Sequence, residues 1–186
     1  MRSPRFVWIP LLAGFWSLSG SLSSIAQAQS NELAAECNQL VNAINQNAQI
    51  MMAFESEIAA YSQTERQAET LEDIKSAAKQ YVDAVDNVTV GLDGLSVDLD
   101  ALLLANTELS SYRDQYVTVV TGFSETLATI AVVMTDVAET ESEEQLPERI
   151  EAVQTQTGTA IAEFDQLSMQ ESDIVEGVNN LCSGNG

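Results

Sequence analysis

Two cysteines, Cys37 and Cys182, are the residues of this chain with the most defined chemistry. They are the only thiols among 186 residues, and Cys182 lies close to the C-terminus. In an oxidising compartment such a pair commonly forms a disulfide, which would stabilise the fold by about 4–5 kcal/mol on the chain-entropy model. The alternative is two separate thiols, one of them buried like any small apolar side chain. We predict the disulfide, which requires a fold that brings the two residues together.

Carboxylates are the second group that could do chemistry, because the chain has 28 acidic residues and only seven Lys and Arg. Asp93, Asp98 and Asp100 could ligate calcium, but their spacing is not that of an EF-hand, and acidic residues beside glycine commonly cap or turn the backbone. The segment "ETESEEQLP" is either a solvated linker or a weak cation site, and its glutamates are Glu139, Glu141, Glu143 and Glu144. We predict no specific metal site and keep cations as candidate partners of the acidic segment 139–148.

The residues that are missing exclude most common enzyme chemistries. The chain has no histidine, which rules out histidine-held haem, the common zinc sites and the Ser-His-Asp and Cys-His arrangements. Neither G-x-x-x-x-G-K-[ST] nor G-x-G-x-x-G occurs, so no loop is a candidate for cradling phosphate. We therefore predict that the protein is not an enzyme, with no catalytic residue and no cofactor.

The first 28 residues have the three parts of a secretory signal peptide. Arg2 and Arg5 give a basic start, residues 6–18 are mostly apolar, and the small-residue motif "AQA" ends at Ala28. The apolar part is shorter than the ~20 residues that a membrane-spanning helix needs. We predict cleavage after Ala28, export to the periplasm or the cell exterior, and one domain over residues 29–186.

The charge of the mature chain limits its partners. Removing Arg2 and Arg5 with the signal peptide takes the formal net charge from −21 to −23. Such a surface repels nucleic acid and anionic lipid, so we expect no nucleic acid and, after cleavage, no membrane as partner. The expected partners are cations or an unidentified protein.

Apolar residues recur at alternating steps of three and four along the mature chain, which is the pattern of amphipathic helices. The pattern predicts four helices, near residues 31–62, 65–104, 107–140 and 147–181. Helices of similar length with short connections predict an all-α, antiparallel up-down four-helix bundle. In this topology the first helix starts where the fourth ends, which would place Cys37 beside Cys182.

Several residues mark where these helices begin or weaken. Thr64 starts a capping-box spacing, Asn106 can cap the third helix, and Pro147 suits the first turn of the fourth. The second helix is predicted to kink or break near Gly91 to Val97, where two glycines and β-branched residues weaken helix. A turn at that break would leave an overlong third helix, so we place the turn at residues 105–107.

A few residues on the apolar stripes raise the question of ligand binding. Asn47 interrupts the first stripe, and we interpret it as a polar residue that sets the register of the bundle. Two groups are interpreted as core rather than as ligand contacts: Met51, Met52 and Phe54, and Tyr112 with Tyr116. Ile150 and Ile161 belong to the stripe of the fourth helix and are predicted to face the core.

The stretches "ELSSYRDQYVTVVTGFSETL" and "QLSMQESDIVEGVNNLC" resemble a group of small exported helical proteins of cyanobacteria. In that group a Gln-Glu-Ser segment precedes a last amphipathic turn that ends in cysteine, and an aromatic-containing stretch opens a middle helix. The resemblance implies export and a helical fold and carries no activity. We expect the corresponding residues here, Gln170, Glu171 and Ser172, to have a structural role, such as bonding across to a neighbouring helix end near the disulfide.

Two functions remain open. The first is an exported, non-enzymatic, acidic helical bundle that works through its surface as a structural or interaction module of the cell envelope. The alternative is a periplasmic bundle that binds a small apolar or cationic molecule in its core, motivated by the small residues Ala77, Ala78 and Ala84 and by the weak helix near Gly91. A filled core would favour the first, and a deep, partly apolar cavity the second.

Overall fold

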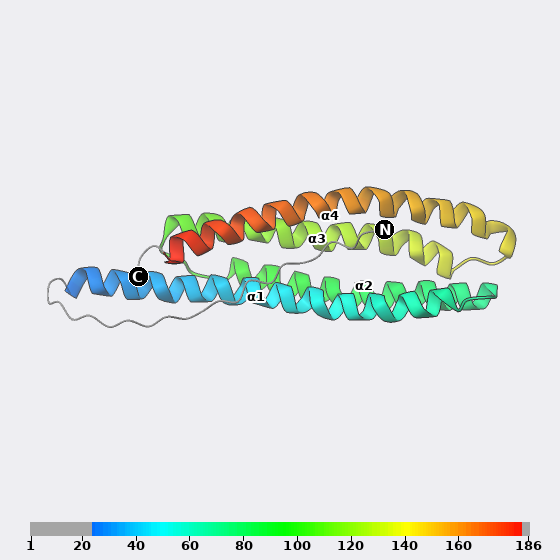
Figure 1. Ribbon diagram of the computed structural model, residues 1–186, viewed down its shortest axis with the longest axis horizontal. Coiled ribbons are helices and arrows are strands. Elements are labelled where there is room, and N and C mark those ends of the chain that lie inside the picture. The colour runs from blue at the N-terminus through cyan, green and yellow to red at the C-terminus, as the bar shows by residue number, and fades with distance from the viewer. Residues whose placement is uncertain (1–23, 184–186) are drawn as a thin grey trace.

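The computed structural model describes the backbone of residues 24–183 and the side chains of residues 31–183, and this part of the chain forms four long α-helices. They are α1 (Ser24–Arg66), α2 (Leu71–Asp100), α3 (Thr107–Ala138) and α4 (Leu146–Ser183), with a short 3-10 helix, η1 (Glu143–Gln145), before α4 (Figure 1). No strand occurs within residues 24–183. The prediction of an all-α protein with four helices packed against each other is confirmed.

Most of the predicted signal peptide, residues 1–23, lies outside the described residues. The helix α1 begins at Ser24, so its backbone is helical across the predicted cleavage point after Ala28. Export and cleavage therefore stay predictions.

The turn between α1 and α2 lies later than predicted. Thr64 is inside α1, where its hydroxyl donates to the carbonyl oxygen of Ala60 at 3.4 Å, so its assignment as a helix start was wrong. The capping box is formed by Thr70 and Asp73: the Asp73 amide donates to Thr70 Oγ1 at 3.2 Å, and the Thr70 amide donates to Asp73 Oδ2 at 3.0 Å. A capping-box spacing occurs at both Thr64 and Thr70. The later one is used because extending α1 past Thr64 adds backbone hydrogen bonds.

The helix α2 is continuous, so the predicted break near Gly91 to Val97 is wrong, and a kink there stays a prediction. Three leucines of this region, Leu92, Leu95 and Leu99, are fully buried, and their burial outweighs the weak helix propensity of the glycines. A Cβ atom at Gly91 would lie 3.3 Å from Ile50 Cγ2 on α1, so this glycine allows α1 to approach closely.

The starts of α3 and α4 agree with the sequence. Asn106 caps α3, because its Oδ1 accepts hydrogen bonds from the amides of Glu108 at 2.9 Å and Leu109 at 3.0 Å. Pro147 lies in the first turn of α4. The helix α2 ends at Asp100, a few residues earlier than predicted, and residues 101–106 connect it to α3.

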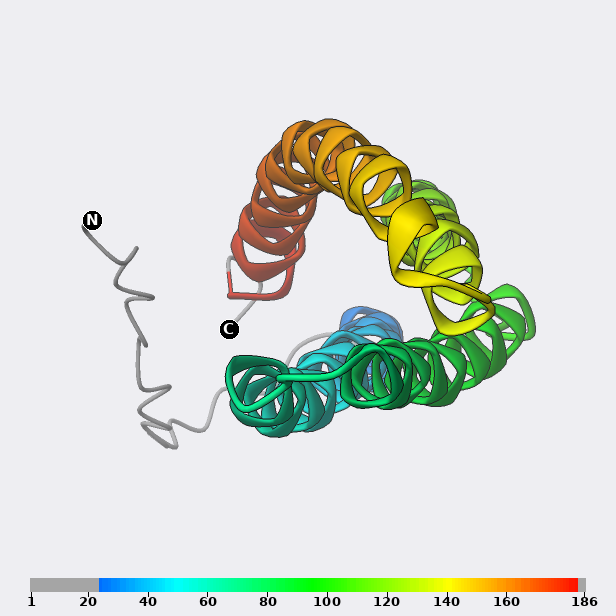
Figure 2. The same cartoon turned by 90° about the vertical axis from the view of Figure 1, so that its right-hand side faces the viewer.

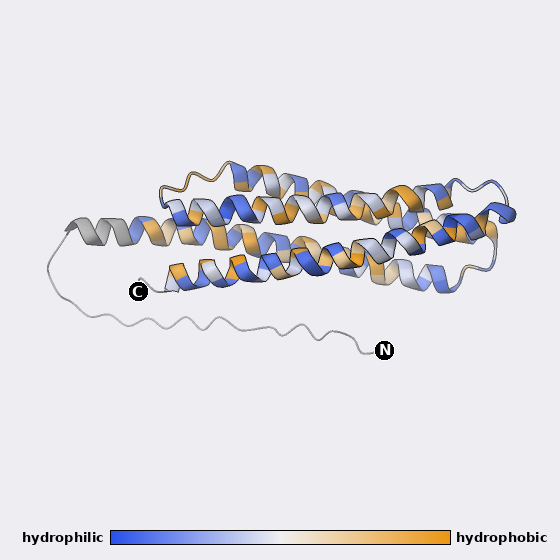
Figure 3. Cartoon of the chain, turned by 90° about the horizontal axis from the view of Figure 1, so that it is seen from above, coloured by the Kyte–Doolittle hydropathy of each residue, from blue (hydrophilic) through white to orange (hydrophobic). Residues whose placement is uncertain are grey.

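The core lies mainly between α2 and α3, which supply most of the fully buried side chains: Leu92, Leu95, Leu99, Tyr116, Val119 and Val120. Hydrophobic positions recur along every helix between hydrophilic ones (Figure 3). The outer helices each pack on one neighbour, α1 on α2 and α4 on α3. The helices α1 and α4 contact each other at few points, and the end-on view shows them lying apart (Figure 2).

This arrangement corrects the prediction that the whole stripe of α4 faces the core. Ile150 is 41% exposed and Ile161 is 56% exposed, and about three helical turns separate them, so they share one flank of α4. Another flank contacts α3, where Leu167 packs on Gly122. The flank with the two isoleucines is exposed because α1 contacts α4 at few points.

One helix among the described residues, α3, is long and apolar enough to cross a membrane. Half of its apolar stretch is buried against the other helices, which is also the pattern of a core helix. The expectation that the mature protein has no membrane partner stays a prediction.

Candidate functional site

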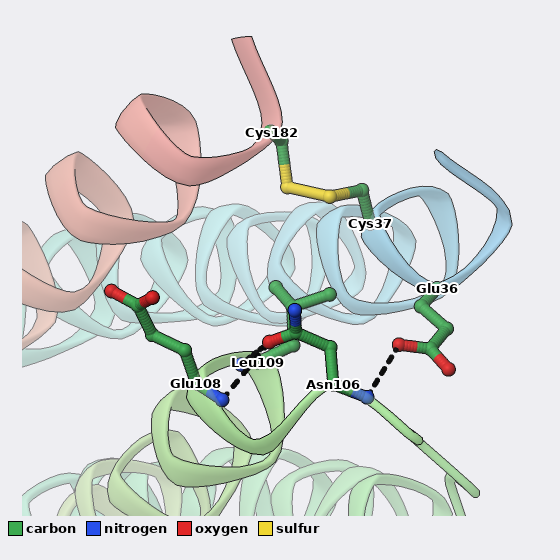
Figure 4. The surroundings of a disulfide bond; sticks show 6 residues. All are labelled: Glu36, Cys37, Asn106, Glu108, Leu109 and Cys182. Carbon is green, nitrogen blue, oxygen red and sulfur yellow. Dashed lines mark hydrogen bonds between the residues drawn. A yellow bond between two sulfur atoms is a disulfide. The ribbon is translucent and has the colours of Figure 1, made fainter. Parts of the chain in front are cut away.

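The disulfide joins α1, about three and a half turns after its first residue, to the end of α4 (Figure 4). The sulfur atoms of Cys37 and Cys182 are bonded at 2.05 Å, and the two Cα atoms are 5.9 Å apart. The predicted pair is confirmed. Because α1 and α4 contact each other at few points elsewhere, this bond is the main connection between the two outer helices.

A buried carboxylate, Glu36, holds the α2–α3 connection at the same end of the bundle. Its Oε1 accepts a hydrogen bond from the Ala105 amide at 2.7 Å, and its Oε2 accepts one from the Asn106 amide at 3.1 Å. Glu36 is only 6% exposed and precedes Cys37 in α1 (Figure 4). Sequence reasoning missed this contact, because no local spacing relates Glu36 to a loop 69 residues away.

A second polar contact, which we call the polar triad, joins Asn47, Tyr116 and Glu171 from α1, α3 and α4. Glu171 Oε1 accepts hydrogen bonds from Asn47 Nδ2 at 2.9 Å and from the Tyr116 hydroxyl at 2.8 Å. Asn47 Nδ2 also donates to the Tyr116 hydroxyl oxygen at 3.0 Å. Both Asn47 and Tyr116 are almost fully buried, so the triad links three helices inside the bundle.

The triad agrees with two predictions made from the sequence. Asn47, expected to set the register, does bond across to two other helices. Glu171 of the Gln-Glu-Ser segment bonds to neighbouring helices, although about three helical turns away from the disulfide rather than beside it. Gln170 and Ser172 are exposed. No described residue bonds Asn47 Oδ1, which is buried.

Burial raises the pKa of three tyrosines. The pKa of Tyr116 lies far above its ordinary value, mainly because burial disfavours the phenolate and also because the Glu171 carboxylate is adjacent. Burial, with repulsion from Tyr61, raises the pKa of Tyr81 to about 12. The pKa of Tyr61 is raised by burial and by the nearby carboxylate of Glu65. These groups therefore favour the neutral form in the folded protein.

We expect Tyr61, Tyr81 and Tyr116 to lose their protons late when the folded protein is titrated with alkali and followed by near-ultraviolet absorbance. Tyr81 should ionise near pH 12, and Tyr116 should ionise only as the protein unfolds. The unfolded chain releases these protons near pH 10, so stability is complete below about pH 10 and falls as the pH rises further. Tyr116→Phe should remove the last step. Ionisation of all four tyrosines together near pH 10, in protein that is still folded, would contradict this prediction.

The candidate metal ligands do not form a site in the described residues. Asp93 accepts a hydrogen bond from Ser124 Oγ at 2.9 Å, and Asp98 and Asp100 are exposed. The four glutamates of the acidic segment, Glu139, Glu141, Glu143 and Glu144, are exposed as well. Within residues 31–183, no three His, Cys, Asp or Glu side chains lie close enough together to hold a metal ion.

The aromatic and methionine groups mostly belong to the core, as predicted. Tyr116 is fully buried, and Met51, Phe54 and Tyr112 pack against the same cluster. Met52 is the exception, because it is 45% exposed. None of these residues lines the mostly apolar hollow at the other end of the bundle.

That hollow, which we call the distal cleft, has a volume of about 380 Å³ and is lined by residues from all four helices. Its floor and walls are mostly apolar: Ile74, Ala77, Ala78, Met134, Val137 and Val153. Tyr61 and Ile150 also line it, and Glu65 supplies the one charged side chain among the described lining residues. Ala84, grouped with Ala77 and Ala78 by the sequence, lines a separate and smaller hollow.

No protein-family model, curated protein or solved structure matches the chain. The resemblance to exported helical proteins of cyanobacteria therefore stays a prediction. Function has to be argued from the disulfide, the polar contacts, the open flank of α4 and the distal cleft.

Proposed function

We propose that this protein is an exported, non-enzymatic, acidic helical bundle that works as an interaction module of the cell envelope and binds a basic protein partner. The observation that carries the proposal is the exposed flank of α4 with Ile150 and Ile161, on a helix that contacts α1 at few points. A contiguous exposed apolar patch marks a surface that another molecule covers, and the side chains along this flank are proposed to form such a patch. The net charge of −21 favours a partner of opposite charge.

Export to the periplasm or the cell exterior is part of the same proposal. It is supported by the basic, apolar and small-residue parts of the first 28 residues. The disulfide is compatible with an oxidising compartment, since such bonds are rare in the cytosol.

We also propose that the four helices run alternately up and down. The contacts at the two ends of the bundle support this topology. The disulfide and Glu36 bring the N-terminal third of α1, the α2–α3 connection and the end of α4 together. The distal cleft gathers Tyr61 near the end of α1, Val137 near the end of α3 and Ile150 near the start of α4.

A second candidate function is binding of a small molecule, and the distal cleft favours it. Its volume of about 380 Å³ lies within the usual range of roughly 300–1,000 Å³ for small-molecule sites, and its lining is mostly apolar with few polar groups. The two candidates share Ile150, which lies on the exposed flank of α4 and also lines the cleft, whereas Ile161 is not among the described lining residues of the cleft.

The proposal is tested by placing a photo-crosslinking amino acid at Ile161 in the exported protein and irradiating intact cells. Val90 is the matched control, because it is also an exposed apolar residue but lies on α2. We expect Ile161 to crosslink one basic envelope protein and Val90 to crosslink none. The recovered protein should have the mass of a chain that begins at Gln29. Equal labelling at both positions, or a chain that retains residues 1–28, would contradict the proposal.

A further inference from the structure

The mostly apolar lining of the distal cleft also carries a negative charge. Glu65 is the one charged side chain among its described lining residues. Four basic residues adjoin the cleft lining in sequence and are not themselves lining residues: Arg66, Lys75, Lys79 and Arg149. Two of them are paired with acidic residues, Lys75 with Glu72 at 3.8 Å and Arg149 with Asp136 at 3.2 Å. The carboxylate of Glu65 in the lining and the net charge of −21 together make the cleft a site that attracts positive charge.

One aromatic ring of the described residues, that of Tyr61, lines the cleft together with the carboxylate. The rings of Tyr61 and Tyr81 meet edge to face, with centroids 5.3 Å apart and planes at 69°. Glu65 follows Tyr61 by about one helical turn and is near enough to its phenol to act on its ionisation. Of the described residues, none hydrogen-bonds the Tyr61 hydroxyl. An aromatic ring beside a carboxylate is a combination that recognises ammonium groups.

The floor of the cleft excludes a bare metal ion and favours an organic body. Ala77 is 3% exposed and Ala78 is 1% exposed, and their small side chains leave the space that Met134 and Val137 border. Hydrocarbon offers no ligand to a hydrated ion, whereas an alkyl group would be removed from water there at a gain of about 25 cal/mol per Å². The cleft is therefore suited to a molecule with an apolar part and a positive charge.

We propose that the distal cleft binds an organic cation, an alkyl-substituted ammonium compound whose apolar part lies on the floor of Ala77 and Ala78 and whose charged group lies beside Tyr61 and Glu65. This inference rests on the small-molecule candidate named above and gives it a ligand class. A neutral apolar molecule would leave Glu65 and the tyrosine ring unused. An anion would meet the repulsion of Glu65 and of the acidic surface.

The probe for the experiment is hexyltrimethylammonium, compared with hexanol and hexanesulfonate, which have the same alkyl chain with no charge and with a negative charge. Binding is followed by the methyl NMR signals of the methionines in the full exported protein. Met134 lines the cleft and is 6% exposed, whereas Met169 is 71% exposed and lies outside it. We expect the cationic probe to shift Met134 with saturation, to leave Met169 unchanged, and to bind more tightly than either other probe.

Variants identify the groups that recognise the charge. Glu65→Gln should weaken binding of the cation by about three- to tenfold and leave hexanol binding unchanged. Glu55→Gln is the matched control, because it removes one exposed negative charge from the same helix away from the cleft lining and should have little effect. Tyr61→Leu should weaken cation binding by about three- to thirtyfold, consistent with the loss of a cation–π contact.

The outcomes separate this inference from the proposed function. Equal affinity for hexanol and the cation, tighter binding of the sulfonate, or equal effects of the two Glu→Gln variants would overturn the inference. An unchanged Met134 signal with all three probes would overturn it as well. Each of these results leaves the crosslink at Ile161 to be judged by itself. A crosslink that fails while the cation still binds at Met134 would instead overturn the interaction module and retain the ligand site.

Discussion

Replacing both Cys37 and Cys182 with serine is expected to lower the melting temperature by on the order of 10–20 °C. The bond closes a loop with a sequence separation of 145 residues, for which the chain-entropy model gives about 4–5 kcal/mol. For a chain of this size, each kcal/mol corresponds to about 2–4 °C. The helical circular-dichroism signal at low temperature should remain largely intact, because the packing of α2 on α3 does not depend on the disulfide.

The arrangement of the helices indicates which part of the protein should open first when the disulfide is removed. The helix α1 packs mainly on α2, and α4 packs mainly on α3, so the disulfide is the main connection between the two outer helices. Without it, the end of α4 should open more often, and amides near Val178 should exchange hydrogen faster than those near Ala160. Reduction of the unmodified protein is the matched control and should reproduce the variant. A melting temperature changed by less than about 2 °C, or free thiols at both cysteines in native protein, would contradict this prediction.

The disulfide could be predicted from the sequence because the prediction depended only on the order and number of the helices. An even number of alternating helices brings the first start to the last end, and small errors in the boundaries do not alter that result. The same holds for Asn106, whose capping role depends on the residues immediately after it. Local pattern was not sufficient everywhere, because the capping-box spacing at Thr64 lies inside α1 and the glycines near Gly91 do not break α2.

The open flank of α4 and the distal cleft could not be predicted from the sequence. The periodicity of α4 identifies an apolar stripe that includes Ile150 and Ile161, but it contains no information on how many neighbours the helix has. Exposure of these residues follows from the sparse contact between α1 and α4. The sequence did single out Ala77 and Ala78 as small residues, yet only the fold places Tyr61 and Glu65 on the same cleft.

Replacing Glu36 with alanine is the second change for which we expect a large effect, a loss of about 2–4 kcal/mol in the free energy of unfolding. The carboxylate accepts hydrogen bonds from the amides of Ala105 and Asn106, and a hydrogen bond to a charged group contributes about 1.5–3 kcal/mol. Glu36→Gln should lose less, since its amide oxygen can still accept one of the two hydrogen bonds. Denaturant unfolding measures the difference between the variants.

The hydrogen bonds of Glu36 attach the α2–α3 connection to the end of the bundle that holds the disulfide. Removing the Glu36 carboxylate should therefore affect residues that are far from it in sequence. In Glu36→Ala the amides of Ala105 and Asn106 should exchange hydrogen faster, although neither residue is changed. Glu32→Ala is the matched control, because it removes an exposed carboxylate about one turn earlier in α1 and should alter stability by less than about 0.5 kcal/mol. The effect of Glu36→Ala should persist in the protein without the disulfide, since the carboxylate binds the connection and not α4. Equal stability of Glu36→Ala and Glu32→Ala, or unchanged exchange at Ala105 and Asn106, would show that the carboxylate does not hold the connection in solution.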